Sequence, residues 1–266
     1  MSTITDAVAA LAKGKLILVV DNEDRENEGD LIMAAEHATT DSVAFFLEHT
    51  SGFLCVALDE PRAETLGLEL MVRDNTDRHR TAFLVSVDYT HGTSTGISAG
   101  DRAATIRALA APETVPTDLA RPGHVLPLLA KPGGVLERPG HTEAGVDLCK
   151  LAGLSGAALL CEVVTPDRRD MMRRPELEAL AAAHDIPIVS IADLRAWRAH
   201  TERAVGRLAR RSKPSVTRSG QSTLPTEVGT FEAIAFGSPV DGVEHLALVM
   251  GNPASSAQAP LVRVHS

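Results

Sequence analysis

Aromatic residues are scarce in this 266-residue chain, where phenylalanine, tyrosine and tryptophan together make up 3% of the sequence. Because 44% of the residues are still hydrophobic, a core must be built mainly from Ala, Val, Leu and Ile, which suits layered α/β packing better than an aromatic-rich sandwich. Basic residues are also fewer than acidic ones, 26 against 35. The resulting formal charge of −9 argues against a nucleic-acid partner, whose phosphates need a basic face.

Cysteines and long apolar runs are few as well. Cys55, Cys149 and Cys161 are odd in number and form no C-x-x-C pair, so neither a disulfide framework nor a structural zinc site is indicated. No apolar run approaches the roughly 18 residues that span a bilayer, and the N-terminus carries Asp6 but no cationic start, unlike a secretory signal. We therefore expect a soluble cytoplasmic protein with reduced thiols and no membrane partner.

Hydrophobic periodicity predicts helices that alternate with strands. We expect helices over residues 4–11, 41–49, 101–111, 143–152, 175–184 and from 193, and strands over 16–20, 53–58, 82–87, 157–164 and 186–191. In the helix over residues 101–111, Asp101 is expected to be the N-cap, and Arg102 and Arg107 are placed on the exposed side. The proline- and glycine-rich residues 118–140 indicate fixed turns shaped for a task. This order favours an α/β class, with a mixed α+β sheet packed against helices.

The composition changes after residue 200. Residues 201–218 contain six Lys or Arg and a single acid, which is typical of a basic linker or an extended helix end. We therefore divide the chain into a domain over residues 1–200, a linker over 201–218 and a segment over 219–266. Alternating apolar residues in 230–236 and 244–249 predict that this last segment is a small, partly ordered β subdomain.

The most unusual stretch is Asp21–Asp30, which reads DNEDRENEGD and follows the apolar run Leu16–Val20. Its crowded carboxylates repel one another unless a cation, a hydrogen-bond donor or an arginine compensates, and Arg25 can compensate only one of them. A solvated charged loop is the simpler alternative. The position at the end of an apolar strand, together with Gly29, favours a ligand-binding loop instead.

Three shorter segments could carry chemistry beside this loop. Residues 121–124 (RPGH) form a rigid turn that presents His124, although such a histidine is often structural. Residues 138–143 (RPGHTE) place an arginine, a glycine turn and a hydroxyl at a helix start, which suits phosphate binding. Glu162 puts a carboxylate into an apolar strand, which is costly unless the group is paired or functional.

Together these segments identify a resemblance. Across roughly residues 1–200, the order and spacing of these segments resemble those of the 3,4-dihydroxy-2-butanone 4-phosphate synthase family. The matching segments are DNEDRENEGD at 21–30, HTSG at 49–52, STGISA at 94–99, RPGH at 121–124 and GHTEA at 140–144. The resemblance implies that family's fold and a lyase of riboflavin biosynthesis. Such a lyase converts D-ribulose 5-phosphate to L-3,4-dihydroxy-2-butanone 4-phosphate and formate through a metal-stabilised enediolate, dehydration and skeletal rearrangement.

The resemblance also implies roles for individual residues. Glu26 and His141 would ligate Mg²⁺, with Mn²⁺ as a possible substitute. Asp30 and Glu162 would contact the sugar hydroxyls and move protons together with Glu26, and His124 would be an acid–base group. The sugar phosphate would be held by Arg25, Arg138 and Thr142, with contacts from Pro139 and Gly140. The family further implies a homodimer with sites near the interface and no organic cofactor.

Some residues depart from the family pattern. Asn22 stands where the family usually has aspartate, and Arg80-Thr81 replaces the more usual Gly-Thr. These changes leave open a paralogue that acts on a related ketose phosphate in a specialised pathway. A non-catalytic scaffold that binds sugar phosphate is a third hypothesis, but the intact metal and acid–base residues named above argue against it.

The C-terminal segment resembles a second enzyme. Residues 224–231, 240–249 and 262–266 are similar to the opening of GTP cyclohydrolase II, which follows this synthase in many bacterial fusions. That enzyme's zinc site needs three cysteines, and no cysteine follows Cys161 in this chain. We therefore expect an incomplete cyclohydrolase-like β segment without GTP cyclohydrolase activity.

Overall fold

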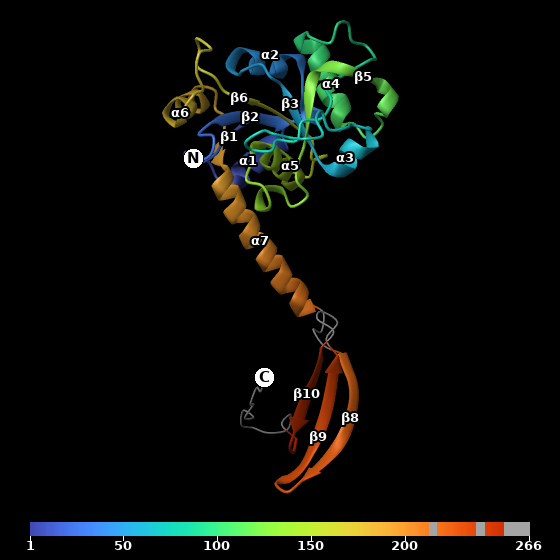
Figure 1. The fold of residues 1–266 in the computed structure, drawn as a ribbon. Helices are drawn as coiled ribbons and strands as arrows, with labels where there is room; N and C mark the ends of the chain where they lie inside the picture. Colours follow the sequence, from blue (N-terminus) through green and yellow to red (C-terminus); the bar gives the residue numbers. More distant parts are fainter. Residues whose placement is uncertain (213–216, 238–242, 253–266) are drawn as a thin grey trace. The chain divides into compact units, whose positions relative to one another are not determined.

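The computed structural model describes residues 1–212, 217–237 and 243–252, so the segment 262–266 lies outside the described residues. The chain divides into two compact units, Met1–His200 and Thr201–Ser266 (Figure 1). In the described part, no helix is long and apolar enough to cross a membrane.

The first unit is built on a mixed seven-stranded sheet with the order β4-β5-β3-β6-β2-β1-β7. The strands are β1 (Ile17–Val20), β2 (Gly29–Ala34), β3 (Cys55–Leu58), β4 (Val87–Tyr89), β5 (Leu119–Leu129), β6 (Ala158–Glu162) and β7 (Ile188–Ser190). The pairs β1–β7 and β3–β5 are parallel, whereas the other neighbours are antiparallel. The predicted α/β class with a mixed sheet is confirmed.

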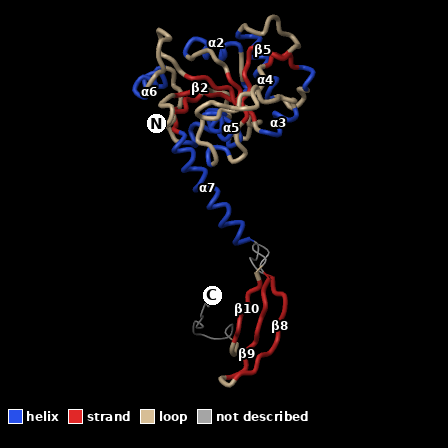
Figure 2. The backbone as a smooth tube through the Cα atoms, in the orientation of Figure 1, coloured by secondary structure: helices blue, strands red, loops and turns tan. Residues whose placement is uncertain are grey.

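Helices cover both faces of this sheet (Figures 1 and 2). One face packs against α1 (Ile4–Leu11), α5 (His141–Leu151) and the start of α7 (Ile191–Ser212). The other packs against α2 (Thr40–His49), α3 (Glu60–Thr65), α4 (Ala99–Ala110) and α6 (Arg174–Ala183). Because a sheet buried on both faces needs apolar side chains on both, all four residues of β1 are buried and their side chains alternate between the two cores.

Two predictions about α4 need correction. Ser98 rather than Asp101 is the N-cap, because its side chain accepts a hydrogen bond from the Asp101 amide. Arg102 is only 9% exposed and does not face water. The prediction was wrong because α4 packs against both α2 and β4, which leaves this helix little free surface.

The strand predictions failed mainly along β5. Residues 119–129 form a strand of 11 residues despite the prolines at 122 and 127, whereas turns were predicted there. The predicted strand 82–87 is reduced to isolated bridges at Phe83 and Leu84, and β4 begins only at Val87. Proline cannot donate a ladder hydrogen bond, but the irregular register between β4 and β5 accommodates it.

Gly123 permits the close approach of β5 to β4. A Cβ atom at this position would lie 2.0 Å from the Val87 carbonyl carbon and 2.2 Å from the Asp88 nitrogen, both backbone atoms that cannot move aside cheaply. We expect Gly123→Ala to lower the free energy of unfolding by about 3 kcal/mol, measured by urea denaturation. Gly100→Ala is the control, because its added methyl would meet only ordinary contacts at 3.6 Å. Equal stability of the two variants would contradict the expectation.

The second unit contains a three-stranded antiparallel sheet with the order β10-β9-β8. Its strands are β8 (Thr217–Thr226), β9 (Gly229–Gly237) and β10 (Glu244–Val249), which confirms the small β-rich segment. Helix α7 continues through Ser212, so the first part of the expected basic linker is helical.

Candidate functional site

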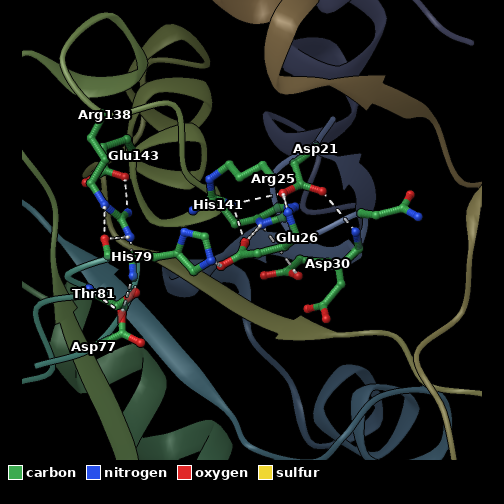
Figure 3. Close-up of polar contacts among 12 residues, drawn as sticks. Asp21, Arg25, Glu26, Asp30, Asp77, His79, Thr81, Arg138, His141 and Glu143 are labelled. Carbon is green, nitrogen blue, oxygen red and sulfur yellow. Dashed lines mark hydrogen bonds and ion pairs between the residues drawn. The ribbon is translucent and has the colours of Figure 1, made fainter. Parts of the chain in front are cut away.

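Asp21 organises the acidic loop between β1 and β2. Its Oδ1 atom accepts a hydrogen bond from the Glu28 amide at 2.9 Å, and its Oδ2 atom accepts one from the Glu26 amide at 3.0 Å. Arg25 also donates to Oδ2, at 2.9 Å, and pairs with the Glu26 carboxylate (Figure 3). A carboxylate that accepts several hydrogen bonds fixes the backbone around it. Asp21 therefore holds Glu26 in place over the sheet.

The sheet register brings two further carboxylates together. Asp30 in β2 lies directly opposite Glu162 in β6. Side chains two residues apart on a strand point to the same face of the sheet. Ile32 and Leu160, each two residues away, belong to the core that contains α5, so Asp30 and Glu162 lie on that face too. His141 is the first residue of α5, and its Nδ1 atom lies 3.9 Å from Asp30 Oδ1. Glu162 is only half-buried, contrary to prediction, because it ends its strand and accepts a hydrogen bond from Ser51 at 2.9 Å.

Three of these residues could hold a metal ion. Each of Asp21, Glu26 and His141 offers a ligand atom, and these atoms lie within 4.8 Å of one another. Among the described residues, His141 Nε2 and Asp30 Oδ1 are buried atoms without a hydrogen-bond partner, as expected of atoms that a bound ligand would contact. Since Asp21 already accepts three hydrogen bonds, Glu26 and His141 are better placed to donate to a cation. Carboxylate oxygen and imidazole nitrogen fit Mg²⁺ or Mn²⁺.

Burial and nearby charges shift the pKa values of Glu26, Asp30 and His141 in different directions. Burial alone would raise the pKa of Glu26, but His141 and Arg25 outweigh it and lower this pKa to about 2. Burial raises the pKa of Asp30 to about 8, and the nearby carboxylates Glu162 and Glu26 add to the shift. For His141, burial lowers the pKa, but Asp30 and Glu26 overcome this effect and raise it to about 9. The site therefore combines one strongly acidic carboxyl, Glu26, with two groups whose pKa values lie above neutrality.

Arg138 forms the wall opposite the acidic loop. Its guanidinium donates to Glu143 at 2.6 Å, to the His79 carbonyl oxygen at 3.1 Å and to Thr81 Oγ1 at 3.1 Å (Figure 3). A Cβ atom on Gly140 would lie 2.4 Å from this guanidinium, so the glycine makes room for the Arg138–Glu143 pair. Arg138 thus joins the loop around residue 79 to the N-terminus of α5.

The sequence profile of one family covers most of the first unit. The profile of 3,4-dihydroxy-2-butanone 4-phosphate synthase matches residues 5–197. The chain belongs to this family. A second profile, that of GTP cyclohydrolase II, matches residues 217–266. The region that belongs to the synthase family is therefore followed by a short cyclohydrolase-like segment, as the resemblance predicts.

Relatives of this chain match both of its parts. The chain is 50% identical over 265 residues to the riboflavin biosynthesis protein RibBA of Nocardia farcinica, with 99% of this chain and 61% of the relative covered. It is 48% identical over 270 residues to RibBA of Mycobacterium avium, with 100% of this chain and 61% of the relative covered. The chain thus spans about three fifths of the length of these relatives.

Solved synthase structures have the same fold. A crystal structure of 3,4-dihydroxy-2-butanone 4-phosphate synthase in complex with two magnesium ions has a TM-score of 0.73 and 43% identity, covering 76% of this chain and 99% of that one. RibBX from A. baumannii, described as a two-domain synthase, has a TM-score of 0.71 and 40% identity, covering 96% of this chain and 72% of that one.

Most of the site residues predicted from the sequence line one cavity of about 100 Å³. Those that do are Arg25, Glu26, Asp30, Arg138, His141, Thr142 and Glu162. Pro139 instead lines a neighbouring cavity beside α7, Gly140 lines neither, and His124 is also outside both. The lining also includes Glu28 and Thr81, and sequence reasoning assigned a role to neither.

Proposed function

We propose that the chain converts D-ribulose 5-phosphate to L-3,4-dihydroxy-2-butanone 4-phosphate and formate in riboflavin biosynthesis. The observation that carries this proposal is the convergence of Glu26, Asp30, His141 and Glu162 in one cavity, beside Arg138 at the N-terminus of α5. The reaction splits one five-carbon phosphate into a four-carbon phosphate and formic acid, and the water that is lost is later consumed, so atoms balance. Several proton transfers in one pocket need groups of different acidity, which these residues supply.

Glu26 and His141 would hold a divalent cation, with Mg²⁺ as the first choice and Mn²⁺ as an alternative. When bound, such a cation polarises a ketone oxygen and acidifies the neighbouring carbinol. Asp30 takes or returns a proton at the carbon skeleton, because its buried carboxyl exchanges protons near neutral pH. Glu162, half-buried and oriented by Ser51, contacts a sugar hydroxyl and assists the loss of water. No organic cofactor is needed for these steps.

The phosphate end of the substrate would lie between Arg138 and the start of α5. Thr142 is 4% exposed and lines the cavity, and the first amides of an α-helix attract anions. Arg25 completes the positive side, because it lines the same cavity. Pro139 and Gly140 shape the turn that begins the helix.

The direct test is formate release from ribulose 5-phosphate by purified protein, with magnesium and with a chelator. We expect formate in the first condition and none in the second. Folded, magnesium-supplied protein that releases no formate would overturn the proposal. Retention of sugar-phosphate binding in such protein would favour the scaffold hypothesis.

We also propose a homodimer, because His124 is 43% exposed in its side chain and lies outside its own cavity. A second copy could bring this histidine to the cavity from across an interface. An equimolar mixture of Glu26→Gln and His124→Ala, each inactive alone, is then expected to regain about a quarter of wild-type activity through mixed dimers. The measurement is formate release after mixing, with sedimentation to establish the dimer. No regained activity in a confirmed mixed dimer would contradict the arrangement.

Magnesium affinity should rise with pH. The pKa of His141 is raised to about 9 in the metal-free chain, and a cation can bind only the deprotonated imidazole. Between pH 7 and about 8.5 we therefore expect the dissociation constant to fall about tenfold per pH unit. Calorimetric titration in two buffers of different ionisation enthalpy would count the released protons. An affinity that is constant over this range would contradict the role of His141.

For the C-terminal segment, we propose that this 266-residue chain has no GTP cyclohydrolase activity of its own. The support is the absence of cysteine after Cys161, because the related enzyme uses three cysteines for zinc. The three cysteines of the chain are buried and unpaired, which supports a reducing, cytoplasmic location.

A further inference from the structure

Asp88 holds His124 through both of its carboxylate oxygens. The Oδ1 atom accepts a hydrogen bond from the His124 amide at 2.8 Å, and the Oδ2 atom contacts the ring nitrogen Nδ1 at 2.7 Å. The Asp88 side chain is 15% exposed, whereas that of His124 is 43% exposed. A partly buried carboxylate thus fixes both the backbone and the ring of a histidine that is more exposed to solvent.

The surrounding backbone encloses this contact. Gly96 has a φ of +88°, and a Cβ atom there would lie 2.1 Å from Asp88 Oδ2 and 2.7 Å from His124 Nδ1. Its loop is fixed by Asp101, whose Oδ2 atom accepts hydrogen bonds from the Ser94 amide, the Ser94 hydroxyl and the Gly96 amide. The glycine therefore allows the loop to close directly over the aspartate–histidine pair.

A buried cation, Arg102, interacts electrostatically with Asp88. Arg102 is 9% exposed, its Nε atom has no hydrogen-bond partner among the described residues, and the Asp88 carboxylate favours its charged form. A carboxylate group accepts hydrogen bonds and donates none, so the contact between Asp88 Oδ2 and His124 Nδ1 is a hydrogen bond in which Nδ1 carries the proton.

We propose that Asp88 is a positioning residue that selects the Nδ1–H tautomer of His124 and leaves Nε2 as an outward-facing base. The same logic operates where an aspartate orients a catalytic histidine in hydrolases. The inference rests on the proposed function, because it assumes that His124 moves a proton in that reaction. It adds a residue that does not line the cavity and acts on the reaction only through His124.

Asp88→Asn is the decisive variant. An amide can both donate and accept, so it no longer selects one tautomer. We expect kcat for formate release to fall about 100-fold or more while KM changes less than about threefold. Asp88→Glu, which keeps the acceptor, should recover part of the loss. The ring nitrogen shifts of ¹⁵N-labelled histidine would show the Nδ1–H form for His124 in the wild type and a mixture in Asp88→Asn.

The chain offers a matched control. His91 and Asp118 form another histidine–aspartate pair, at 2.9 Å, but on an exposed surface with the His91 side chain 63% exposed. Asp118→Asn should leave kcat unchanged. The proposal is overturned if folded Asp88→Asn keeps wild-type kcat, or if wild-type His124 carries its proton on Nε2. Absence of formate from the wild type would refute the proposed function instead, and the nitrogen shifts would still report on Asp88.

Discussion

Glu26→Gln is expected to reduce formate release at least about 1,000-fold, even at high magnesium concentration. The substitution keeps the size of the side chain but removes the charge that a cation would bind. It also removes the partner of His141, whose Nδ1 atom lies 3.7 Å from Glu26 Oε2. Because Asp21 rather than Glu26 folds the acidic loop, the variant should keep its structure. The loss should therefore be one of chemistry and metal binding.

The measurement pairs formate release with magnesium titration and circular dichroism. Glu23→Gln is the matched control, since Glu23 belongs to the same loop, is exposed and lies outside the cluster of potential ligands. It removes the same charge at a nearby position. Equal losses in the two variants would show that the general negative charge of the loop matters, and would refute a specific role for Glu26.

Asp30→Asn is expected to lower kcat about 100- to 10,000-fold, the range for loss of a general acid–base group, while the chain still binds magnesium. Asp30 is 3% exposed, and its Oδ1 atom has no hydrogen-bond partner in the part of the chain that the structure describes. An amide of the same shape fits the space but cannot exchange a proton. The expected signature is loss of turnover with retention of metal affinity, which distinguishes Asp30 from Glu26.

The same variant should change the pH dependence of stability. The pKa of Asp30 is raised from 3.8 to about 8, so the folded state binds a proton that the unfolded state has released. Stability conferred by this proton is complete below pH 3.8 and is lost as pH rises toward 8, by about 1.4 kcal/mol per pH unit. Between pH 5 and 6.5, metal-free wild type should lose stability relative to Asp30→Asn.

Urea denaturation with chelator present would measure this difference, with Asp24→Asn as the exposed control from the same loop. His141 also has a raised pKa, but its contribution is lost mainly above pH 6.5, which is why the lower pH window isolates Asp30. Parallel stability curves for wild type and Asp30→Asn would contradict the raised pKa.

The features that could be predicted from the sequence are those that depend on residues close together in the chain. Hydrophobic periodicity predicts most helices and the class of the sheet, and the acidic loop is visible because charge follows an apolar strand. Other features depend on pairing between distant segments. The burial of Arg102 depends on what packs over α4, and the Asp88–His124 contact depends on a register shift between β4 and β5. Proline in β5 also misled the strand prediction, because an irregular ladder tolerates it.

The role of Asp21 could not be predicted from the sequence, for a different reason. Within a ten-residue acidic stretch, composition does not reveal which carboxylates accept backbone hydrogen bonds and which remain available to a ligand. The answer lies in the turn geometry: Asp21 accepts the amides of Glu26 and Glu28, and Asn27 adopts a left-handed conformation with φ of 56°. A carboxylate that looks like a ligand in the sequence is thus largely a structural acceptor.

The shortage of aromatic residues gives this protein two optical reporters at useful places. Its single tryptophan, Trp197, packs at the start of α7 against the core that contains α5, and its single tyrosine, Tyr89, follows Asp88 directly in the chain. Tryptophan emission therefore reports on one helix alone, without contributions from elsewhere. Tyrosine absorbance would report on the end of β4 beside His124. Events at the two places can be followed separately in the wild-type chain, with no label attached.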